Sequence, residues 1–306
     1  PITVTVTDAN DAPVITSSAS FNAAENQIAA ATLTATDEDT GATLTFSLSG
    51  GADVALFELE SSTGILSFKA APDFETPADV DGDNIHEVIL EVGDGTVSVT
   101  QSFTVTVTDA NDAPAFTSLA SFNAAENQVV GGTITAIDVD AGDTLTFTIT
   151  GGVDAALFSL DGSTGSLTFK TAPDFEIPSD ADTDNVHEVT LEVGDGIVTV
   201  SQAITIIVTD ANDAPVFSLP SLAPGALENQ TSVTTVTATD QDAGDVLTFT
   251  LAGGSDVALF DLDSSTGVLT FKVAPNFESP ADTDGDNVHK LTLQASDGLG
   301  VVVQPI

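Results

Sequence analysis

The sequence Asp-Ala-Asn-Asp-Ala-Pro occurs three times, and its residue types and spacing suit the binding of a hard cation. The copies begin at Asp8, Asp109 and Asp210, and each ends at a proline. Each follows a run in which Thr alternates with Val or Ile, a pattern typical of a β-strand. Proline cannot donate to a sheet ladder and holds the preceding residue extended, so we expect each strand to end there. Two carboxylates and an amide within four residues then supply oxygen ligands of the kind that hard cations take.

The spacing of this motif reveals an internal repeat. The distance from Asp8 to Asp109 and from Asp109 to Asp210 is the same, 101 residues (109 − 8 and 210 − 109). A unit of about 100 residues is an ordinary domain size and can bury a core without cross-links. The chain has no Cys, which excludes disulfide scaffolds and thiolate zinc sites and leaves the redox compartment open. We predict the last strand and linker of a preceding repeat at 1–13, and repeats at 14–112, 113–213 and 214–306, the third without its last strand.

The charge of the chain excludes several classes of partner. Lys and Arg number 4 against 47 Asp and Glu, which gives a formal net charge of −43. Nucleic acids and anionic lipid surfaces need basic patches, so neither is an expected partner. Hydrophobic residues make up 42% of the chain, which argues against an acidic disordered tail. Divalent cations would neutralise such a protein, and adaptation to high salt is the alternative. We also expect no direct membrane span, since no stretch is apolar enough.

The pattern of alternation predicts the fold class. In the second repeat we expect strands at 115–122, 133–137, 145–149, 156–160, 166–170, 189–193 and 198–208. Turn residues separate these segments, and no stretch has a helical period. The sequence therefore predicts an all-β fold of tandem seven-stranded β-sandwich domains arranged end to end.

Consecutive domains would be joined by a very short and very acidic linker. Only Asp112, Ala113 and Pro114 separate one repeat from the next. Two carboxylate charges 4 Å apart repel by about 1 kcal/mol in water and roughly 4 kcal/mol at an effective dielectric constant of 20. Bound cations would reverse the sign of this interaction. We therefore interpret the linkers as cation-filled joints, and surface acids of a salt-adapted protein as the alternative.

Each unit resembles a cadherin repeat, of the kind found in large bacterial surface and secreted repeat proteins. The resemblance covers the whole of each repeat and depends on an ordered set of motifs. In the second repeat these are Ala125-Glu126-Asn127, Asp138-Val139-Asp140, Phe158-Ser159-Leu160 with Thr164-Gly165, Asp174-Phe175-Glu176, Asp195 and the acidic linker.

The resemblance implies Greek-key sandwiches with Ca²⁺ ions at each boundary between repeats. For the first joint it implies the ligands Glu25, Asp73, Glu75, Asp109, Asn111, Asp112, Asp138, Asp140 and Asp195. For the second joint it implies Glu126, Asp174, Glu176, Asp210, Asn212, Asp213, Asp240, Asp242 and Asp297. The chemistry agrees, because each Ca²⁺ takes six to eight oxygen ligands.

The sequence departs from the family pattern at four points. Ala113 and Ala214 stand where the family linker ends in Asn, so these positions offer only a backbone carbonyl. Phe replaces the basic residue of the Asp-x-Glu motif, and Asn276 replaces its Asp in the third repeat, which predicts a weaker joint there. The chain has no Trp, so adhesion by Trp exchange is not implied.

A second acidic loop recurs in every repeat. Carboxylates at its positions 1, 3 and 5 and Asn at position 6 resemble the start of an EF-hand-type calcium loop, although no acid stands at position 12. We predict Ca²⁺ here, with a solvated acidic loop as the alternative. The acids concerned are Asp79, Asp81, Asp83, Asp180, Asp182, Asp184, Asp282, Asp284 and Asp286.

No catalytic constellation is present in the sequence, so we do not expect an enzyme. The three histidines share one repeated position ahead of a strand and are interpreted as structural. Lys69, Lys170 and Lys272 also share a position, where we expect them to pair with nearby acids, and Phe57, Phe158 and Phe260 are expected in the cores.

Three classes of function remain. The first is a calcium-rigidified extracellular spacer or stalk of an adhesin or other cell-surface assembly. Another is an accessory module of a secreted enzyme. The remaining class is a self-assembling filament, in which residues 1–7 of one chain complete the third repeat of another. In that filament a further joint would combine Glu228, Asn276 and Glu278 with Asp8, Asn10, Asp11, Asp37, Asp39 and Asp94. Partners are then Ca²⁺ and neighbouring repeats or other copies of the chain. Extracellular calcium modules have Kd values of about 10⁻⁴ to 10⁻³ M, which favours a secreted location.

Overall fold

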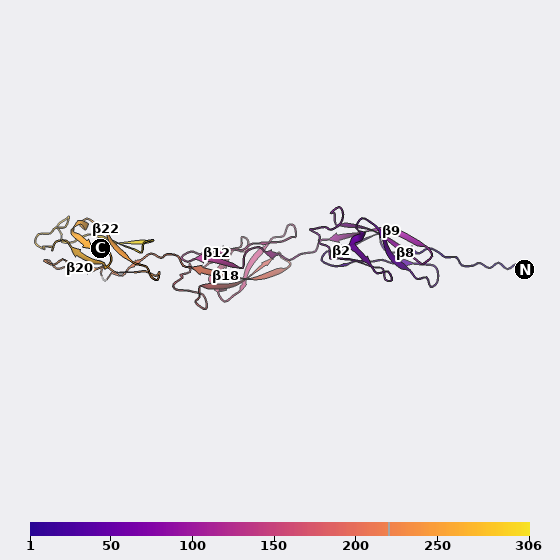
Figure 1. The fold of residues 1–306 in the computed structure, drawn as a ribbon, viewed down its shortest axis with the longest axis horizontal. Coiled ribbons are helices and arrows are strands. Elements are labelled where there is room, and N and C mark those ends of the chain that lie inside the picture. Colours follow the sequence, from indigo (N-terminus) through magenta and orange to yellow (C-terminus); the bar gives the residue numbers. More distant parts are fainter. Residues whose placement is uncertain (220) are drawn as a thin grey trace. The chain divides into compact units, whose positions relative to one another are not determined.

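The computed structural model describes residues 1–219 and 221–306, and within them the chain is built of β-strands (Figure 1). The only helical elements in this part of the chain are three single turns of 3₁₀ helix, η1 (Val54–Leu56), η2 (Ala155–Leu157) and η3 (Val257–Leu259). No helix among the described residues is long and apolar enough to cross a membrane. The expected all-β class is therefore confirmed.

The same series of strands occurs three times. The first series is β1 (Val14–Ile15), β2 (Ser20–Ala24), β3 (Ala29–Thr32), β4 (Ala35–Thr36), β5 (Thr45–Gly50), β6 (Phe57–Leu59), β7 (Ile65–Phe68), β8 (Ile85–Gly93) and β9 (Ser98–Thr108). The second is β10 (Ala115–Phe116), β11 (Ser121–Ala125), β12 (Val130–Thr133), β13 (Ala136–Ile137), β14 (Thr146–Gly151), β15 (Phe158–Leu160), β16 (Ser166–Phe169), β17 (Val186–Gly194) and β18 (Thr199–Thr209). The third is β19 (Val216–Phe217), β20 (Ser232–Thr235), β21 (Ala238–Thr239), β22 (Thr248–Gly253), β23 (Phe260–Leu262), β24 (Val268–Phe271), β25 (Thr292–Ser296) and β26 (Val301–Pro305).

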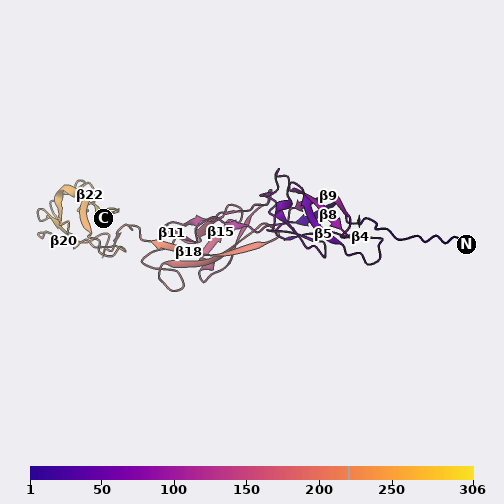
Figure 2. The same cartoon turned by 45° about the vertical axis from the view of Figure 1, so that its right-hand side comes forward.

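Each of the first two series forms a sandwich of a four-stranded and a three-stranded sheet. In the first series the strand orders are β2-β9-β8-β5 and β3-β7-β6, and β1 pairs with β4. Strand β2 runs parallel to β9, whereas the other neighbours are antiparallel. Figure 2 shows β5, β8 and β9 side by side. Because β1 and β4 form a separate two-stranded pair, the two larger sheets contain seven strands, which is the number that the pattern predicts.

Contacts between residues divide the described chain into two compact units. The first contains residues 1–116, 136–146 and 193–200, and the second contains 117–135, 147–192 and 201–306. The two acidic turns at 136–146 and 193–200 thus share a unit with the first repeat and with the linker that follows it. The predicted repeat boundaries stay a prediction.

Alternating side chains build each core. In β8, inward residues such as Val88 and Leu90 are buried and alternate with more exposed ones. Phe57, Phe158 and Phe260 lie in the cores, as expected. His86 lies within β8 rather than ahead of a strand, and it is buried edge-on against the rings of Phe57 and Phe68. The histidine is therefore part of the core, which agrees with a structural role.

Two local expectations differ from the structure. Residues 156 and 157, expected in a strand, belong to the turn η2, and β15 begins at Phe158. The lysine expected to pair with acids contributes to this turn, because Lys170 Nζ donates to the carbonyl oxygen of Ala156 at 2.8 Å. Lys272 makes the equivalent bond to Ala258 and also lies 3.9 Å from Asp261.

The hairpin of β15 and β16 agrees with the expectation. Gly165 adopts a positive φ in its turn, where a Cβ would collide with the Ile134 carbonyl.

The acidic loop of the second repeat contains a strained residue. Position 4 of this loop is Gly82 in the first repeat and Gly285 in the third, with φ of 74° and 73°. The second repeat has Thr183 there, with φ of 61°. The left-handed region is unfavourable for a β-branched residue, so Thr183 holds strain that glycine would avoid.

We predict that Thr183→Gly stabilises the protein by about 0.5–1 kcal/mol. This is the free-energy cost of holding a threonine in the left-handed region, minus the larger loss of backbone entropy when glycine folds. Thermal unfolding in excess chelator measures the change. The matched control, Gly82→Thr, creates the same strain in the first repeat and is expected to lower stability by a similar amount. A lower stability of Thr183→Gly would contradict this reading of the loop.

Candidate metal sites

A buried glutamate organises each acidic joint. Glu25 follows β2 and is 1% exposed. Its Oε1 accepts the backbone N–H of Ala110 at 2.8 Å, and its Oε2 accepts that of Phe74 at 2.7 Å. Glu126 is equally buried and makes the same two bonds, to Ala211 and Phe175. The glutamate thereby fixes the linker against the Asp-Phe-Glu turn of the same repeat.

The linker is also held by acids that come later in the sequence. Asn111 Nδ2 donates to Asp195 Oδ2 at 3.0 Å, and the Asp112 N–H donates to Asp140 Oδ2 at 2.7 Å. The second linker repeats this pattern, with Asn212 bonded to Asp297 and Asp213 to Asp242. Residues far apart in the sequence therefore converge at each linker, as the cation-joint interpretation expects.

Carboxylate oxygens gather closely at both joints. In each of three groups at the first joint, one oxygen per residue lies within 4.8 Å of the others. The groups are Glu25, Asp73 and Glu75; Glu75, Asp109 and Asp140; and Asp138, Asp140 and Asp143. Glu75 and Asp140 each belong to two groups, so the three groups share residues and lie next to one another. At the second joint, Glu126, Glu176, Asp210 and Asp242 meet the same criterion.

Several of these oxygens are buried without a hydrogen-bond donor. They are Glu75 Oε2, Asp138 Oδ2 and Asp140 Oδ1 at the first joint, and Glu176 Oε2, Asp240 Oδ2 and Asp242 Oδ1 at the second. An unpaired buried acceptor costs about 1–3 kcal/mol, and more when it is charged. The same atoms are orphaned in both copies, so this is a property of the site. Such oxygens are available to a cation.

The electrostatics of the joints also favour a cation. Burial raises the pKa of Glu75, and the nearby charges of Glu25, Asp109 and Asp140 raise it further. Burial likewise raises the pKa of Asp112, with Glu25 and Asp140 adding to the effect. Glu176 and Asp213 show the same upward shifts at the second joint. Both joints therefore concentrate negative charge that nearby groups of the protein do not neutralise.

The residues that the sequence predicts for a further joint belong to the N-terminal segment, the first repeat and the third repeat. Near the N-terminus, Asn10 Nδ2 donates to Asp94 Oδ2 at 2.9 Å and the Asp11 N–H donates to Asp39 Oδ2 at 2.8 Å. Asp39 N–H in turn donates to Asp37 Oδ1, and Asp8 lies in the exposed segment before them. These bonds match those of the complete joints.

The residues of the third repeat that the sequence predicts for this joint are more exposed. Glu228 accepts the Phe277 N–H at 3.1 Å, and Asn276 Oδ1 accepts the Glu278 N–H. Glu228 is exposed, in contrast to the buried Glu25 and Glu126.

Two kinds of joint residue are missing from the sequence-based ligand set. Asp143 lies close to Asp138 and Asp140, and its pKa is raised, as is that of its counterpart Asp245. In the sequence, Asp143 could have been recognised as the third acid of the turn that contains Asp138 and Asp140. Asn26 Nδ2 donates to Asp112 Oδ1 at 3.0 Å and Asn127 does the same to Asp213. These asparagines hold the last aspartate of each linker in place, and in the sequence they could have been recognised because a Glu-Asn pair recurs in each repeat.

The second acidic loop folds around its first aspartate. Asp79 is buried, and its carboxylate accepts the N–H groups of Asp83 and Asn84 at 2.8 and 3.3 Å. Asp81 and Asp83 each bring one oxygen within 4.8 Å of Asp79. Asp180 and Asp282 accept the same two N–H groups in their repeats. The third loop differs, because Lys290 Nζ lies 2.7 Å from Asp284 Oδ2, whereas the first two repeats have Glu87 and Glu188 at the lysine position.

We predict that metal-free protein becomes more stable as the pH falls from neutral toward about 5. The folded pKa values of Glu75 and Glu176 lie above the ordinary 4.5. In this window the folded state binds more protons than the unfolded state, so stability is lost as the pH rises. At lower pH the trend reverses, because Asp161 and Asp263 have folded pKa values of about 2 and lose their hydrogen-bonded stabilisation on protonation.

Unfolding temperatures in chelator, measured across this range, test the prediction. The double variant Glu75→Gln with Glu176→Gln removes the joint carboxylates and leaves the other acids of the chain in place. Its unfolding temperature is expected to change less with pH than that of the wild type. Equal slopes for the two proteins would contradict a contribution from the joints.

Comparison with known proteins supports one fold. No protein-family model matches the chain. Rat protocadherin-16 is 32% identical over 299 residues, which cover 89% of this chain and 9% of that protein. Human protocadherin-23 is 33% identical over 258 residues, covering 78% of this chain and 7% of that protein. The chain thus spans less than a tenth of the curated relatives that it matches.

Solved structures agree with these relatives. Mouse cadherin-23 EC22–24 aligns with a TM-score of 0.55 at 23% identity, covering 97% of each chain. The extracellular domain of protocadherin γB4 aligns with a TM-score of 0.51 at 25% identity, covering 98% of this chain and 49% of that one. The chain therefore has the fold of tandem cadherin repeats.

Proposed function

We propose that the chain is a calcium-binding extracellular spacer, whose linkers Ca²⁺ holds in one conformation. The observation that carries the proposal is the set of buried carboxylate oxygens without donors, such as Asp140 Oδ1, in the middle of each joint. Hydrogen bonds within the protein satisfy other oxygens of the site, such as Asp140 Oδ2, and leave these without a donor. Such an arrangement suits a cation better than any uncharged ligand.

The donor set fits calcium in particular. The joints offer carboxylate and amide oxygens, and the chain has no Cys. Calcium takes six to eight oxygen ligands in flexible geometry, whereas zinc favours nitrogen and sulfur donors. At the first joint Glu25, Glu75, Asp109, Asp138 and Asp140 would hold the ions, with Asn111 and Asp112 positioned by their bonds to Asp195 and Asp140. We propose an extracellular location as well, because modules that bind Ca²⁺ with Kd values of about 10⁻⁴ to 10⁻³ M suit the calcium concentration outside the cell.

Calcium would make the linker rigid because its ligands come from both sides of the linker. Asp73 and Glu75 precede it, Asp109 belongs to it, and Asp138 and Asp140 follow it. Burial raises the pKa of Glu75 and of Asp112, and the nearby carboxylates raise both further. Without a cation, the repulsion between these carboxylates favours separation of the segments. With a cation, the same charges attract the segments to a common centre. A bacterial source stays a prediction from the sequence pattern.

We further propose a Ca²⁺ ion in the second acidic loop of the first two repeats. The buried Asp79 orients the loop through backbone N–H groups, and Asp81 and Asp83 add oxygens beside it. In the third repeat the Lys290 ammonium already occupies the position of a neutralising charge next to Asp284. A solvated loop is the alternative, and the lysine provides a way to test it.

We predict that Asp140→Asn weakens calcium binding at the first joint while keeping the metal-free fold. The asparagine carbonyl can still accept the Asp112 N–H, whereas its amide replaces the orphaned oxygen. Calcium at 100 times its Kd stabilises the wild type by about 2.7 kcal/mol per site. The variant is expected to lose most of this gain at one joint. Calorimetric titration and unfolding with and without calcium measure both quantities.

Small-angle scattering of the same proteins tests the mechanical part of the proposal. The wild type is expected to sample a narrower range of sizes in millimolar calcium than in chelator, and Asp140→Asn to stay broad in calcium. Glu58→Gln removes the same charge from an exposed position of β6 and is the control. Scattering that does not respond to calcium would overturn the spacer proposal.

We predict that Lys290→Glu adds a calcium site to the third repeat, because it gives this loop the residue found in the other two. The reverse change, Glu188→Lys, is expected to remove or weaken the site in the second repeat. Equilibrium dialysis gives the number of ions bound per chain. An unchanged number for both variants would favour the solvated loop.

A further inference from the structure

One asparagine connects the second acidic loop of the first repeat with its acidic joint. Asn84 is the sixth residue of the loop and is 9% exposed. Its backbone N–H donates to Asp79 Oδ1 within the loop at 3.3 Å. Its Nδ2 donates to the Phe74 carbonyl at 2.8 Å, and its own carbonyl accepts the Val107 N–H at 2.9 Å. Asn84 therefore bonds to the loop, to the Asp-Phe-Glu turn and to strand β9, which leads into the linker.

The Asp-Phe-Glu turn connects this asparagine with the linker. The Phe74 N–H donates to Glu25 Oε2 at 2.7 Å, and Glu25 Oε1 accepts the N–H of Ala110 in the linker at 2.8 Å. The Phe74 side chain also packs against the core of the first repeat, so the turn is held by its side chain and by its backbone. A continuous path of hydrogen bonds thus runs from the acidic loop through Asn84 and the turn to the linker.

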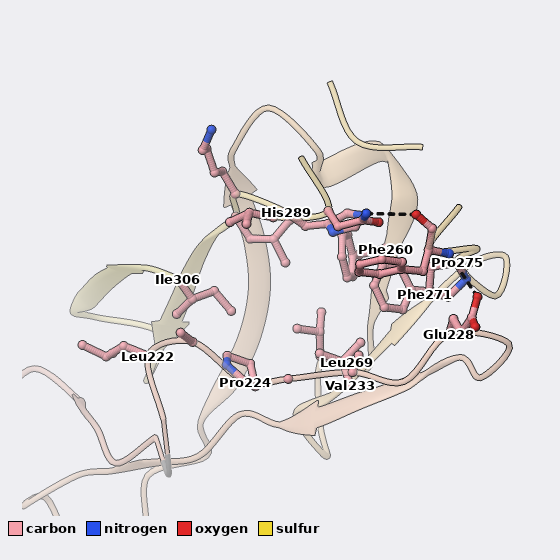
Figure 3. A pocket seen from close by; sticks show the side chains of 18 residues that line it. Leu222, Pro224, Glu228, Val233, Phe260, Leu269, Phe271, Pro275, His289 and Ile306 are labelled. Carbon is pink, nitrogen blue, oxygen red and sulfur yellow. Dashed lines mark hydrogen bonds between the residues drawn. The ribbon is translucent and has the colours of Figure 1, made fainter. Parts of the chain in front are cut away.

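The other repeats have the same path. In the second repeat, Asn185 Nδ2 donates to the Phe175 carbonyl at 2.8 Å, and the Phe175 N–H donates to Glu126 Oε2 at 2.7 Å. The third repeat has the two corresponding bonds, at 3.0 and 3.1 Å, between Asn287, Phe277 and Glu228, which are among the residues drawn in Figure 3. The path is therefore a property of the repeat and not of one loop.

The backbone at this loop position explains why the residue is an asparagine. Asn84 and Asn185 have φ values of 63° and 64°, in the left-handed region that asparagine tolerates better than most residues. Glycine would adopt the same backbone but has no side chain to reach the turn. The Oδ1 atoms of both asparagines are buried without a donor, which is unfavourable. The bond from Nδ2 to the turn offsets this cost.

We propose that Asn84 and Asn185 are positioning residues through which the acidic loop strengthens Ca²⁺ binding at the joint of the same repeat. One oxygen each of Asp79, Asp81 and Asp83 lie within 4.8 Å of one another, so their charges repel in the metal-free loop. A cation bound there offsets this repulsion, and the loop then keeps the conformation in which Asn84 reaches the turn. The coupling rests on the calcium function proposed above, whereas the positioning role of the asparagines follows from the fold.

An ordered loop favours binding at the joint because both sites depend on the same turn. Asp73 and Glu75 flank Phe74 and belong to one group of joint carboxylates. A turn that Asn84 already holds loses less conformational entropy when the joint binds its ions. Charge does not oppose this effect, since the three aspartates of the loop keep it negative with one Ca²⁺ bound. The coupling is reciprocal, so binding at the joint strengthens binding in the loop by the same factor.

Hydrogen exchange of the full chain, followed by mass spectrometry during a calcium titration, tests the coupling. Protection of segments 73–76 and 109–112 reports on the first joint. Asp81→Asn weakens the loop site and leaves the bonds that Asp79 accepts from the loop backbone. It is expected to move the midpoint of protection to a calcium concentration roughly 5-fold higher or more. The matched control, Asp182→Asn, makes the same change in the loop of the second repeat and is expected to leave this midpoint unchanged.

Asn84→Gly separates the coupling from the charge of Asp81, because it keeps the left-handed backbone and removes the bond to Phe74. In this background, Asp81→Asn is expected to lose most of its effect on the midpoint. A shift of the same size with and without the asparagine would overturn the proposal, since the charge alone would then account for it. Asn84→Asp keeps the shape of the side chain, replaces the donor and is expected to act like Asn84→Gly.

Exchange in chelator distinguishes the failure of this proposal from the failure of the calcium function. Asn84→Gly is expected to speed the exchange of segment 73–76 about 5-fold, with β7 (Ile65–Phe68) unchanged as a control for folding. Faster exchange in a protein whose joints do not respond to calcium would support the positioning role and overturn the coupling. A joint that responds to calcium with the same midpoint in the wild type and in Asp81→Asn would overturn the coupling and leave the calcium function intact. Unchanged exchange in Asn84→Gly would overturn the positioning role.

Discussion

The stability of the structure depends on how the repulsion between carboxylates that the fold brings together is offset. Each linker is so short that the acids before, within and after it converge, and hydrogen bonds satisfy only part of their oxygens. The remaining oxygens are buried and face like charges, which in isolation opposes the folded arrangement. The same repulsion becomes attraction once a divalent cation lies between them. Under the proposed function, the geometry of the linker depends on the calcium concentration of the surrounding solution.

The buried glutamate gives this site its precision. Glu25 and Glu126 each accept two backbone N–H groups, one from the linker and one from the Asp-Phe-Glu turn. Both carboxylate oxygens are thus engaged in the metal-free protein. The glutamate sets the positions of linker and turn before any ion binds, so less conformational entropy remains to be lost on binding. The two asparagines that follow, Asn26 and Asn127, extend this scaffold to the last aspartate of each linker.

The third repeat differs from the other two at its glutamate. Glu25 and Glu126 are buried where each accepts a linker N–H, whereas Glu228 is exposed. The histidines do not differ in this way, because His289 packs edge-on against Phe260 and Phe271 as His86 does against Phe57 and Phe68. The packing of the core around the histidine is therefore common to all three repeats.

The sequence by itself determined the fold class, the repeat and most of the residues that converge at the joints. These properties are local or periodic: alternating Thr and Val predict strands, and an acidic motif at a fixed interval predicts equivalent sites. The loop acids and Glu-Asn pairs were visible for the same reason. Local patterns also account for the errors. Residues 156 and 157 have strand-like neighbours but belong to a 3₁₀ turn, whose Ala156 carbonyl accepts a hydrogen bond from Lys170, a residue remote in the sequence.

Only the tertiary structure decided which oxygens remain without donors, because this depends on hydrogen bonds between residues as far apart as Asn111 and Asp195. It also placed Asp143 in the first joint and the histidines in the cores, since burial follows from packing of distant strands.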